Sequence, residues 1–455
     1  MQRIFGSNMK TILLSQRKER DDLLARNYIH RHTTLNTDEL LNSHLIKLIT
    51  GPRRVGKSTQ ALLMLRNKNF AYLNFDKQEL LDNWNADWVM RLLDEVYPGY
   101  DYLLLDEVQN LPHWDVWVSE LFRQGKNLII TGSNANMLSS EMATMLTGKY
   151  LPIEMLPFSL AEFFEWHHLD PKAILPEQQN EATVLEDDYL RLGGYPETVA
   201  ARSLTTSYLS TLFDSIIWKD IVKRHKIRKT EDINNMALYL LTNFCNQLSA
   251  NDIANALSIG SVATTQKFMA YLHEPFLFYY LPRYNNKLKM MAKAPKKIYV
   301  VDNGFVAAKA FSTSDNLGRL LENQVFVNLL RKGYDPEKSM FYYRTRNDKE
   351  VDFVLRENNR VKQLVQVSYE MTSNKTIRRE CSALAEAAQE LHCTDLYVLT
   401  YNEKRTMEWE GNTIQVLAAS EWFNRNSLSI NNKFLKNQIS LCIDNKSNEI
   451  KGEFS

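Results

Sequence analysis

A set of glycine, lysine and hydroxyl residues lies at one fixed spacing in the stretch LITGPRRVGKST. The pattern is G-x-x-x-x-G-K-[ST], in which Gly51 and Gly56 enclose four residues and Lys57 and Ser58 follow at once. Glycines let backbone N–H groups turn inward around a phosphate, and the start of a following helix adds its positive end. The lysine reaches the outer phosphates and the serine hydroxyl binds Mg²⁺. The stretch predicts a phosphate cradle formed by Gly51, Pro52, Arg53, Arg54, Val55, Gly56, Lys57, Ser58 and Thr59.

An acidic pair ends a second apolar run, YLLLDEVQN. Asp106 and Glu107 follow the buried-strand pattern of residues 102–105. Ligands of open α/β sheets bind at the carboxyl ends of the strands. We therefore expect Asp106 to be a Mg²⁺ ligand together with Ser58, and Glu107 to act as the general base that polarises the attacking water. The alternative is a surface acidic pair that follows a strand.

A third apolar run, NLIITGSN, ends in small polar residues. Ser133, or Asn134 in its place, would sense the γ-phosphate through a hydrogen bond from a neighbouring strand tip. The alternative is a helix cap before ANMLSS. The three stretches together predict one nucleotide site, with Lys57, Glu107 and Ser133 as its catalytic residues.

The elements that must position these residues are short apolar runs separated by amphipathic helical stretches, from Ile46 to Leu156. The runs are LIKLIT, FAYLNF, YLLLDE, NLIITGS and, more weakly, KYLPIEM. Continuous apolar strands between helices predict a parallel sheet covered on both faces. The predicted fold class is therefore α/β, with the parallel sheet of a P-loop NTPase.

The composition of the whole chain excludes several classes of protein. With 455 residues, two to four domains are expected, and a net charge of +1 means that a nucleic-acid or membrane partner must meet a local patch. No apolar stretch is long enough to span a bilayer. The four cysteines lack paired spacing, which fits a reducing compartment. We expect a cytoplasmic protein without a membrane partner.

Several motifs, taken in order, resemble a known family: bacterial and archaeal AAA-type ATPases with a C-terminal restriction-endonuclease-like domain of unknown function. The resemblance runs from about Tyr28 to about Phe423, through GPRRVGKST, YLLLDEVQN, ITGSN, LTGKYLPIEMLPFSLAEFF, YLRLGGYPETV, SIIWKDIVKRH, KIYVVDNG, LENQVFVNLL and EVDFVL. It implies a P-loop ATPase that uses ATP and Mg²⁺, followed by a helical segment, a winged helix and a nuclease-like α/β end.

These patterns together suggest six parts. They are a helical lead-in over residues 1–45, the ATPase core over 46–157, a helical lid over 158–235, a winged-helix module over 236–296, a nuclease-like domain over 297–424 and a polar tail over 425–455. The tail is rich in Asn, Lys and Ser, although FLKNQISLCI could dock as a strand.

The family resemblance has one departure in the core. The family usually has arginine after the glycine at the position where this chain has Gly148-Lys149. If that arginine completes a γ-phosphate site, Lys149 offers a point charge in place of a planar fork, and hydrolysis would be slow. Arg53 and Arg123 are alternative cations, or else solvated surface charges.

The stretch LSANDIANALSIGSVATTQKFMAYLHEPFLFYYLPRY predicts a helix, a turn, a second helix and a β-wing. Ser249 would cap the first helix with Asp252 three residues on, and the second would expose Thr264, Gln266 and Lys267. A basic flank could track a DNA backbone through Lys287, Lys289, Lys293, Lys296 and Lys297. Winged helices also serve as protein–protein spacers, and lysine runs are usually solvated. DNA, a protein partner and self-association therefore all remain open.

The nuclease resemblance supplies three slots: a Glu on a helix, an Asp at a strand start and [E/Q]-x-K on the next strand, which hold Mg²⁺ and orient water. Glu322 and Asp352 fill the first two slots, and Gln366 is tolerable in the third, but Ser368 stands where lysine belongs. We therefore expect a nuclease-like fold used for binding, unless Glu322 and Asp352 are only structural.

The function predicted from these features is a Mg²⁺-dependent ATPase that switches conformation and is coupled to a winged helix and a degenerate nuclease-like module. The alternative is an ATP-gated DNA-binding protein or nuclease. A third interpretation is a signalling NTPase that acts through protein contacts.

Overall fold

The computed structural model describes residues 2–32, 36–135, 146, 148–311 and 316–424. The described residues divide into two compact units: the first is built from Met1–Leu156 with Glu274–Phe276, and the second from Pro157–His273 and the described residues that follow from Leu277 to Asn424. The predicted polar tail, with FLKNQISLCI and Cys442, lies outside the described residues.

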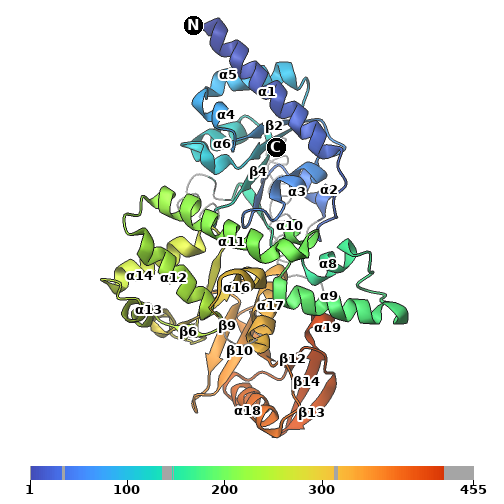
Figure 1. Ribbon diagram of the computed structural model, residues 1–455, viewed down its shortest axis with the longest axis vertical. Helices are drawn as coiled ribbons and strands as arrows, with labels where there is room; N and C mark the ends of the chain where they lie inside the picture. The colour runs from blue at the N-terminus through green and yellow to red at the C-terminus, as the bar shows by residue number, and fades with distance from the viewer. Residues whose placement is uncertain (1, 33–35, 136–145, 147, 312–315, 425–455) are drawn as a thin grey trace, which may run out of the picture. The chain divides into compact units, whose positions relative to one another are not determined.

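The first unit, drawn in blue to teal in Figure 1, contains a five-stranded sheet. The strand order is β2-β3-β4-β1-β5, and all of its pairs are parallel. The strands are β1 (Ile46–Thr50), β2 (Phe70–Asn74), β3 (Tyr102–Asp106), β4 (Asn127–Gly132) and β5 (Tyr150–Glu154). Every residue of β1 is buried, as expected when helices cover both faces of a sheet. The predicted α/β parallel sheet is confirmed.

Helices surround this sheet and were expected from the amphipathic stretches between the strands. They are α1 (Gln2–Leu24), α2 (Thr37–Asn42), α3 (Lys57–Met64), α4 (Gln78–Asp82), α5 (Ala86–Val96), the 3₁₀ turn η1 (Val108–Asn110) and α6 (Trp114–Arg123). In register, Thr50 of β1 pairs with Gly132 of β4, and Asn74 of β2 with Asp106 of β3. The carboxyl ends of these strands therefore meet at one edge, with β4 between β1 and β3.

The second unit begins with helices. They are α8 (Leu160–Trp166), η3 (Pro176–Gln178), α9 (Gln179–Leu192), α10 (Pro196–Val199), η4 (Arg202–Leu204), α11 (Thr205–Ser215), the π-helix η5 (Ile216–Lys223) and α12 (Thr230–Thr242). Ser159 and Glu162 form a capping box that fixes the start of α8, because each side chain accepts a hydrogen bond from the other residue's backbone N–H.

A small antiparallel sheet of order β6-β8-β7 follows, with helices between its strands. The elements are β6 (Gln247–Leu248), α13 (Ala250–Ala256), α14 (Val262–His273), β7 (Phe278–Leu281), α15 (Leu288–Lys293) and β8 (Lys296–Val300). The predicted cap of α13 is present: the Ser249 hydroxyl accepts from the Asp252 N–H at 3.1 Å, and the Asp252 carboxylate accepts from the Ser249 N–H at 3.0 Å.

A six-stranded mixed sheet ends the described chain, in the order β13-β14-β12-β11-β10-β9. Its strands are β9 (Met340–Arg344), β10 (Glu350–Glu357), β11 (Arg360–Val367), β12 (Leu396–Thr400), β13 (Arg405–Trp409) and β14 (Asn412–Ala418). The helices of this region are α16 (Asn303–Lys309), α17 (Leu317–Arg331), α18 (Asn374–Leu391) and α19 (Ala419–Asn424). Leu384 of α18 is fully buried in one core with Val354 and Leu364 of the sheet, a burial that stabilises by about 1.5–3 kcal/mol per side chain.

Two motifs of the family resemblance, YLRLGGYPETV and KIYVVDNG, meet within the second unit. The buried carboxylate of Asp302 accepts from the N–H groups of Gly194 and Gly304, each at 2.8 Å, and so joins α9–α10 to the start of α16. A Cβ atom at Gly193 would lie 1.7 Å from the Asp302 Oδ1. The close approach requires glycine there, and these motif residues therefore serve packing in this structure.

Candidate functional site

The loop between β1 and α3 has the backbone geometry that its glycines were expected to provide. Gly51 has φ 140°, and a Cβ atom there would lie 2.0 Å from the carbonyl oxygen of Met155. Gly56 has φ 94° and caps α3, while Arg54 is also left-handed at φ 65°. The angles of Gly51 and Gly56 would strain a residue that carries a Cβ atom, so the turn depends on both glycines.

A buried arginine braces this loop from the N-terminal segment. Arg31 donates through Nη1 to the carbonyl oxygen of Val55 and through Nη2 to that of Leu156, both at 2.6 Å. Val55 is itself fully buried. The Arg31 side chain therefore holds the middle of the loop in place. The sequence patterns did not indicate this role for Arg31.

Lys57 begins α3 and is buried at 4 % exposure. Its Nζ lies 2.9 Å from the carbonyl oxygen of Pro52, which it reaches across the loop, and 3.5 Å from Glu107 Oε1. The ammonium group therefore points over the loop towards the end of β3, as the cradle interpretation expects.

Asp106 ends β3 and is surrounded by hydroxyl donors. Ser58 Oγ donates to Asp106 Oδ1 at 2.7 Å, Thr131 Oγ1 donates to the same oxygen, and Tyr72 Oη donates to Oδ2 at 3.0 Å. Burial and the nearby Glu107 charge raise the pKa of Asp106 to about 6, against the lowering effect of the three hydrogen bonds. A carboxylate in this environment favours a nearby cation.

Glu107 follows directly in a left-handed conformation, φ 52°. Its N–H donates to Thr131 Oγ1 at 2.9 Å, and its Oε2 accepts from Ser133 Oγ at 3.1 Å and from Gln109 Nε2. Burial acts to raise the pKa of Glu107, but the Lys57 ammonium and these hydrogen bonds outweigh it and hold the pKa below its usual range. Glu107 is therefore an ionised, oriented carboxylate.

The structure brings the predicted residues of the three strand tips into one network at the carboxyl edge of the sheet. The network includes Lys57, Ser58, Asp106, Glu107 and Ser133. Sequence reasoning missed three of its members: Tyr72, Gln109 and Thr131. The sequence did offer a signal for Thr131 and Gln109, because each is a polar residue two positions from a predicted site residue, Ser133 and Glu107 respectively. It gave none for Tyr72, which lies inside an apolar run.

The three cations considered for the γ-phosphate lie in different places. Arg53 is close enough to Glu107 to help lower its pKa. Arg123 is exposed at the end of α6. Lys149 precedes β5, at the edge of the sheet where strands begin, and its Nζ lies 3.4 Å from Ser119 Oγ. Lys149 is therefore outside the network at the carboxyl edge.

The sequence also matches models of known protein families. An AAA domain matches residues 43–164, and two domains of unknown function match residues 185–316 and 317–422. An uncharacterised protein of Methanocaldococcus jannaschii is 31 % identical over 396 residues, which cover 83 % of this chain and 88 % of the relative. An uncharacterised protein of Haemophilus influenzae is 32 % identical over 352 residues, 73 % of this chain and 84 % of the relative.

This chain belongs to the AAA-type P-loop ATPases with a C-terminal part of unknown function. A solved Walker-type ATPase of Pyrococcus abyssi is also similar, with a TM-score of 0.40 and 14 % identity over 63 % of this chain and 99 % of that chain. Within the described residues, none of the helices combines the length and the apolar character needed to cross a membrane.

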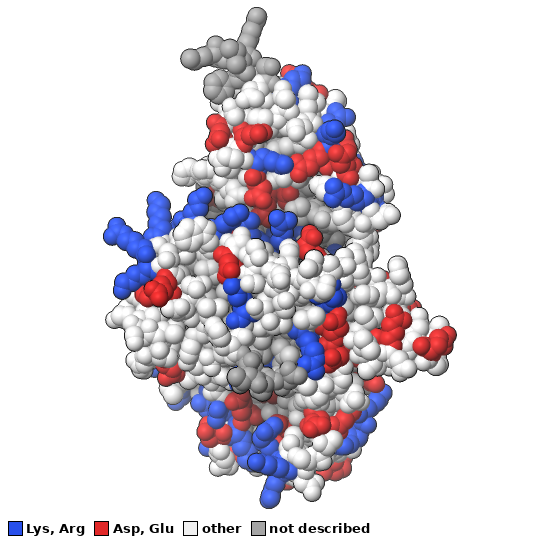
Figure 2. All heavy atoms as spheres, viewed as in Figure 1, with Lys and Arg blue, Asp and Glu red and all other residues white. Residues whose placement is uncertain are grey.

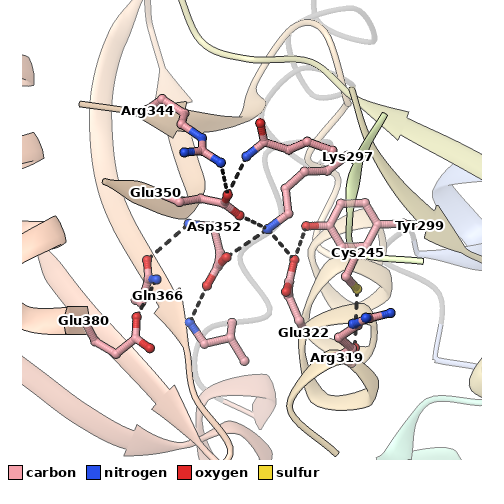
Figure 3. A network of polar contacts seen from close by, with 12 residues as sticks. Cys245, Lys297, Tyr299, Arg319, Glu322, Arg344, Glu350, Asp352, Gln366 and Glu380 are labelled. Atoms are coloured by element: carbon pink, nitrogen blue, oxygen red, sulfur yellow. Dashed lines mark hydrogen bonds and ion pairs between the residues drawn. The ribbon is translucent and has the colours of Figure 1, made fainter. Parts of the chain in front are cut away.

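The second unit of this AAA-type ATPase contains another polar network, centred on a lysine (Figure 3). Lys297 of β8 is 1 % exposed, and its Nζ lies 2.6 Å from Glu322 Oε1, 2.8 Å from Glu350 Oε1 and 2.9 Å from Asp352 Oδ1. Burial acts to lower the pKa of Lys297, but Asp352 and Glu322 raise it well above its ordinary value. The ammonium group is therefore a permanent cation among three carboxylates from α17 and β10.

The predicted nuclease slots lie around this lysine. Gln366 accepts from the Asp352 N–H at 3.2 Å and donates to Glu380 Oε2 at 2.6 Å. Ser368 donates instead to the carbonyl oxygen of Glu370 at 2.8 Å. Sequence reasoning missed Glu350, although it stands two residues before Asp352, and missed that Lys297 projects into this group from another sheet.

The predicted DNA-tracking flank is wrong for Lys297, because the lysine is buried in this ion cluster. Lys296 forms an ion pair with Glu337 at 3.2 Å, while the other three lysines of the flank, Lys287, Lys289 and Lys293, are exposed on or beside α15. On α14, Gln266 and Lys267 are exposed as predicted, and Thr264 is half-buried.

Proposed function

We propose that this protein binds ATP with Mg²⁺ at the β1–α3 loop and hydrolyses it. The observation that supports this most is the convergence of Lys57 and Ser58, from the start of α3, on the acidic end of β3. An ammonium group, a hydroxyl and two carboxylates at the carboxyl edge of a parallel sheet are the set that triphosphate chemistry requires.

The donor set at Asp106 suits Mg²⁺. The ion prefers hard oxygen ligands and takes one or two carboxylates together with substrate phosphates. The Ser58 hydroxyl and the Asp106 carboxylate lie 2.7 Å apart, and the buried carboxyl has a raised pKa of about 6. These two residues would hold the ion, which when bound supplies charge neutralisation between the β- and γ-phosphates.

The remaining residues have separate roles in this proposal. The Lys57 ammonium binds the outer phosphates, and the N–H groups of the loop bind the inner ones. Glu107 orients the attacking water and accepts its proton, since Ser133 and Gln109 fix its carboxylate in place. Ser133 reports the γ-phosphate, because its hydroxyl can exchange Glu107 for a phosphate oxygen.

Two substitutions test the assignment with purified protein. Lys57→Ala is expected to abolish ATP binding, while Glu107→Gln retains binding and loses turnover by two to four orders of magnitude, about the contribution of a general base. Lys68→Ala, at an exposed lysine just after α3, is the matched control and is expected to behave as wild type. Turnover at the wild-type rate in both site variants would refute the assignment.

We further propose that the ATPase cycle acts on the second unit, with residues 236–296 as a winged-helix module and the six-stranded sheet region as a nuclease-like module that binds without cutting. The support for the last point is Lys297, whose ammonium fills the space among Glu322, Glu350 and Asp352. Plasmid incubated with protein, ATP and Mg²⁺ or Mn²⁺ should stay intact. Cleavage that disappears in Asp352→Ala would instead support an active nuclease.

A further inference from the structure

A basic stretch joins the π-helix η5 to α12. Five exposed cations fall within residues 218–229: Lys219, Lys223, Lys226, Arg228 and Lys229. The single acidic residue of the stretch, Asp220, is 1 % exposed and lies 3.8 Å from the guanidinium of Arg224. The surface of this stretch is therefore positive, in a chain whose net charge is only +1.

The π-helix separates this stretch into a buried and an exposed side. Its apolar residues Ile216, Ile217, Ile221 and Val222 are buried, whereas Lys219, Lys223 and Trp218 are exposed, the tryptophan at 59 %. π-Helical segments are rare in proteins and occur frequently at functional sites. An exposed indole among lysines offers a flat surface next to positive charge.

The end of the basic stretch is packed against α14. The ring of His225 stacks on that of Tyr271, with 3.6 Å between centroids and 14° between planes, and Lys267 Nζ lies 5.7 Å from the centre of the same ring. Tyr271 therefore connects the basic stretch to the helix that exposes Gln266 and Lys267. Figure 2 shows Lys and Arg side chains gathered at the left of the view, over the helices around α12 and α14.

We propose that residues 218–229 and the exposed face of α14 form a binding surface for duplex DNA. The cations of the stretch contact backbone phosphates, and α14, with its exposed Gln266 and Lys267, faces the major groove. B-form DNA suits this arrangement because its major groove admits an α-helix, whereas that of duplex RNA is too deep and narrow. The lysine flank at α15 then contributes less to DNA binding than this surface does. The inference concerns the second unit alone and does not depend on ATP hydrolysis.

Charge reversal at three of these lysines tests the surface. The probe is a fluorescein-labelled duplex of about three helical turns, titrated with protein between about 50 and 200 mM salt. Lys223→Glu, Lys226→Glu and Lys229→Glu, combined, should weaken binding roughly tenfold or more at the lower salt concentration. The salt slope should become shallower by about 2.7, or about 0.9 for each phosphate that is no longer neutralised. Circular dichroism verifies the fold of the variant.

The matched control reverses the same charge elsewhere. Lys287→Glu, Lys289→Glu and Lys293→Glu, combined, change three exposed lysines of the predicted flank and should leave the salt slope within about one unit of wild type. An equal weakening in both triple variants would contradict the proposed location, as would a wild-type protein that binds no duplex at the lower salt concentration. Displacement of the duplex by polyglutamate as readily as by unlabelled DNA would assign the surface to an acidic protein instead.

Binding is also measured in the Lys57→Ala background without nucleotide. Retained duplex binding there, with ATP turnover absent, is the expected result and separates the two proposals. In the Lys223/Lys226/Lys229 variant we expect the reverse: ATP turnover persists while duplex binding is lost. This result would show that the DNA surface and the ATPase site are independent.

Discussion

At the residue scale, Thr131 is the group that joins the two acidic residues of the nucleotide site. Its hydroxyl donates to Asp106 and accepts from the Glu107 N–H, and it is fully buried. The backbone at Glu107 is left-handed, a conformation that persists only where the surroundings hold it. Thr131 therefore determines both the direction of one carboxylate and the turn that presents the next.

Thr131→Val tests this role. The variant keeps the shape of the side chain but leaves the buried N–H of Glu107 without its acceptor and removes one of the three hydroxyl donors of Asp106, which costs about 1–3 kcal/mol of stability. Urea unfolding measures that loss, and ATP turnover should fall with it. Thr131→Ser retains the hydroxyl and should behave closer to wild type; equal defects in both variants would mean that the hydrogen bonds alone do not account for the loss.

Asp302 gives a pH dependence whose sign follows from burial. Burial raises the pKa of Asp302 to about 6, although the Gly194 and Gly304 N–H groups act to lower it. The folded pKa lies above the unfolded value of about 3.9. The folded state therefore holds an extra proton between these values, and the associated stability is complete below about pH 4 and lost as the pH rises through about 6.

The comparison is with Asp302→Asn, which cannot titrate. The unfolding free energy of wild type relative to the variant should fall by about 2–3 kcal/mol between about pH 4 and pH 7, at 1.36 kcal/mol per unit of pKa. Thermal or urea unfolding at several pH values measures the difference. A difference that is constant across this range would contradict the raised pKa.

At the scale of elements, Lys297 connects β8 of the small sheet to α17 and to β10 of the large one. Its three carboxylate contacts fall within 2.6–2.9 Å. Tyr299 of β8 also donates to Glu322 Oε1 at 2.6 Å. Removing one partner from a buried ionic group leaves uncompensated charge, which costs more than the pair itself contributes.

Lys297→Met should therefore destabilise the second unit by about 3–5 kcal/mol. The matched control is Lys296→Met on the same strand, whose ion pair with the largely exposed Glu337 contributes about 1 kcal/mol or less. Urea unfolding of both variants measures the contrast. Adding Glu322→Gln to Lys297→Met should restore part of the loss, and no restoration would argue against charge as the cause.

Elements were predictable from sequence where one local pattern determines them. The five strands of the first unit follow from continuous apolar runs, and the cap of α13 follows from Ser249 and Asp252. Contacts between distant segments were not. Lys297 stands in a lysine-rich run that suggests an exposed surface, and only the pairing of β8 within its sheet directs its side chain into a carboxylate group. Tyr72 and Arg31 were missed for the same reason.

At the scale of the whole molecule, nucleotide binding should be visible as a change in unfolding of the two units. A ligand at about one hundred times its Kd stabilises the state that binds it by about 2.7 kcal/mol. MgATP should therefore raise the unfolding transition of the first unit in wild type and in Glu107→Gln, but not in Lys57→Ala. Scanning calorimetry measures these shifts.

The same scans examine the proposed coupling between the units. If the ATPase cycle acts on the second unit, its transition should also move with MgATP, and the movement should vanish in Lys57→Ala. A first transition that shifts while the second stays in place would leave ATP binding intact and contradict the coupling.

The guanidinium of Arg31 holds the carbonyl oxygens of Val55 and Leu156 with its two terminal nitrogens. Because the guanidinium is rigid and planar, it fixes the distance between these two carbonyl oxygens. Leu156 is also the last residue of the first unit before the chain continues into the second. Arg31 therefore ties the loop that would surround a triphosphate to the residue at which the chain leaves the first unit.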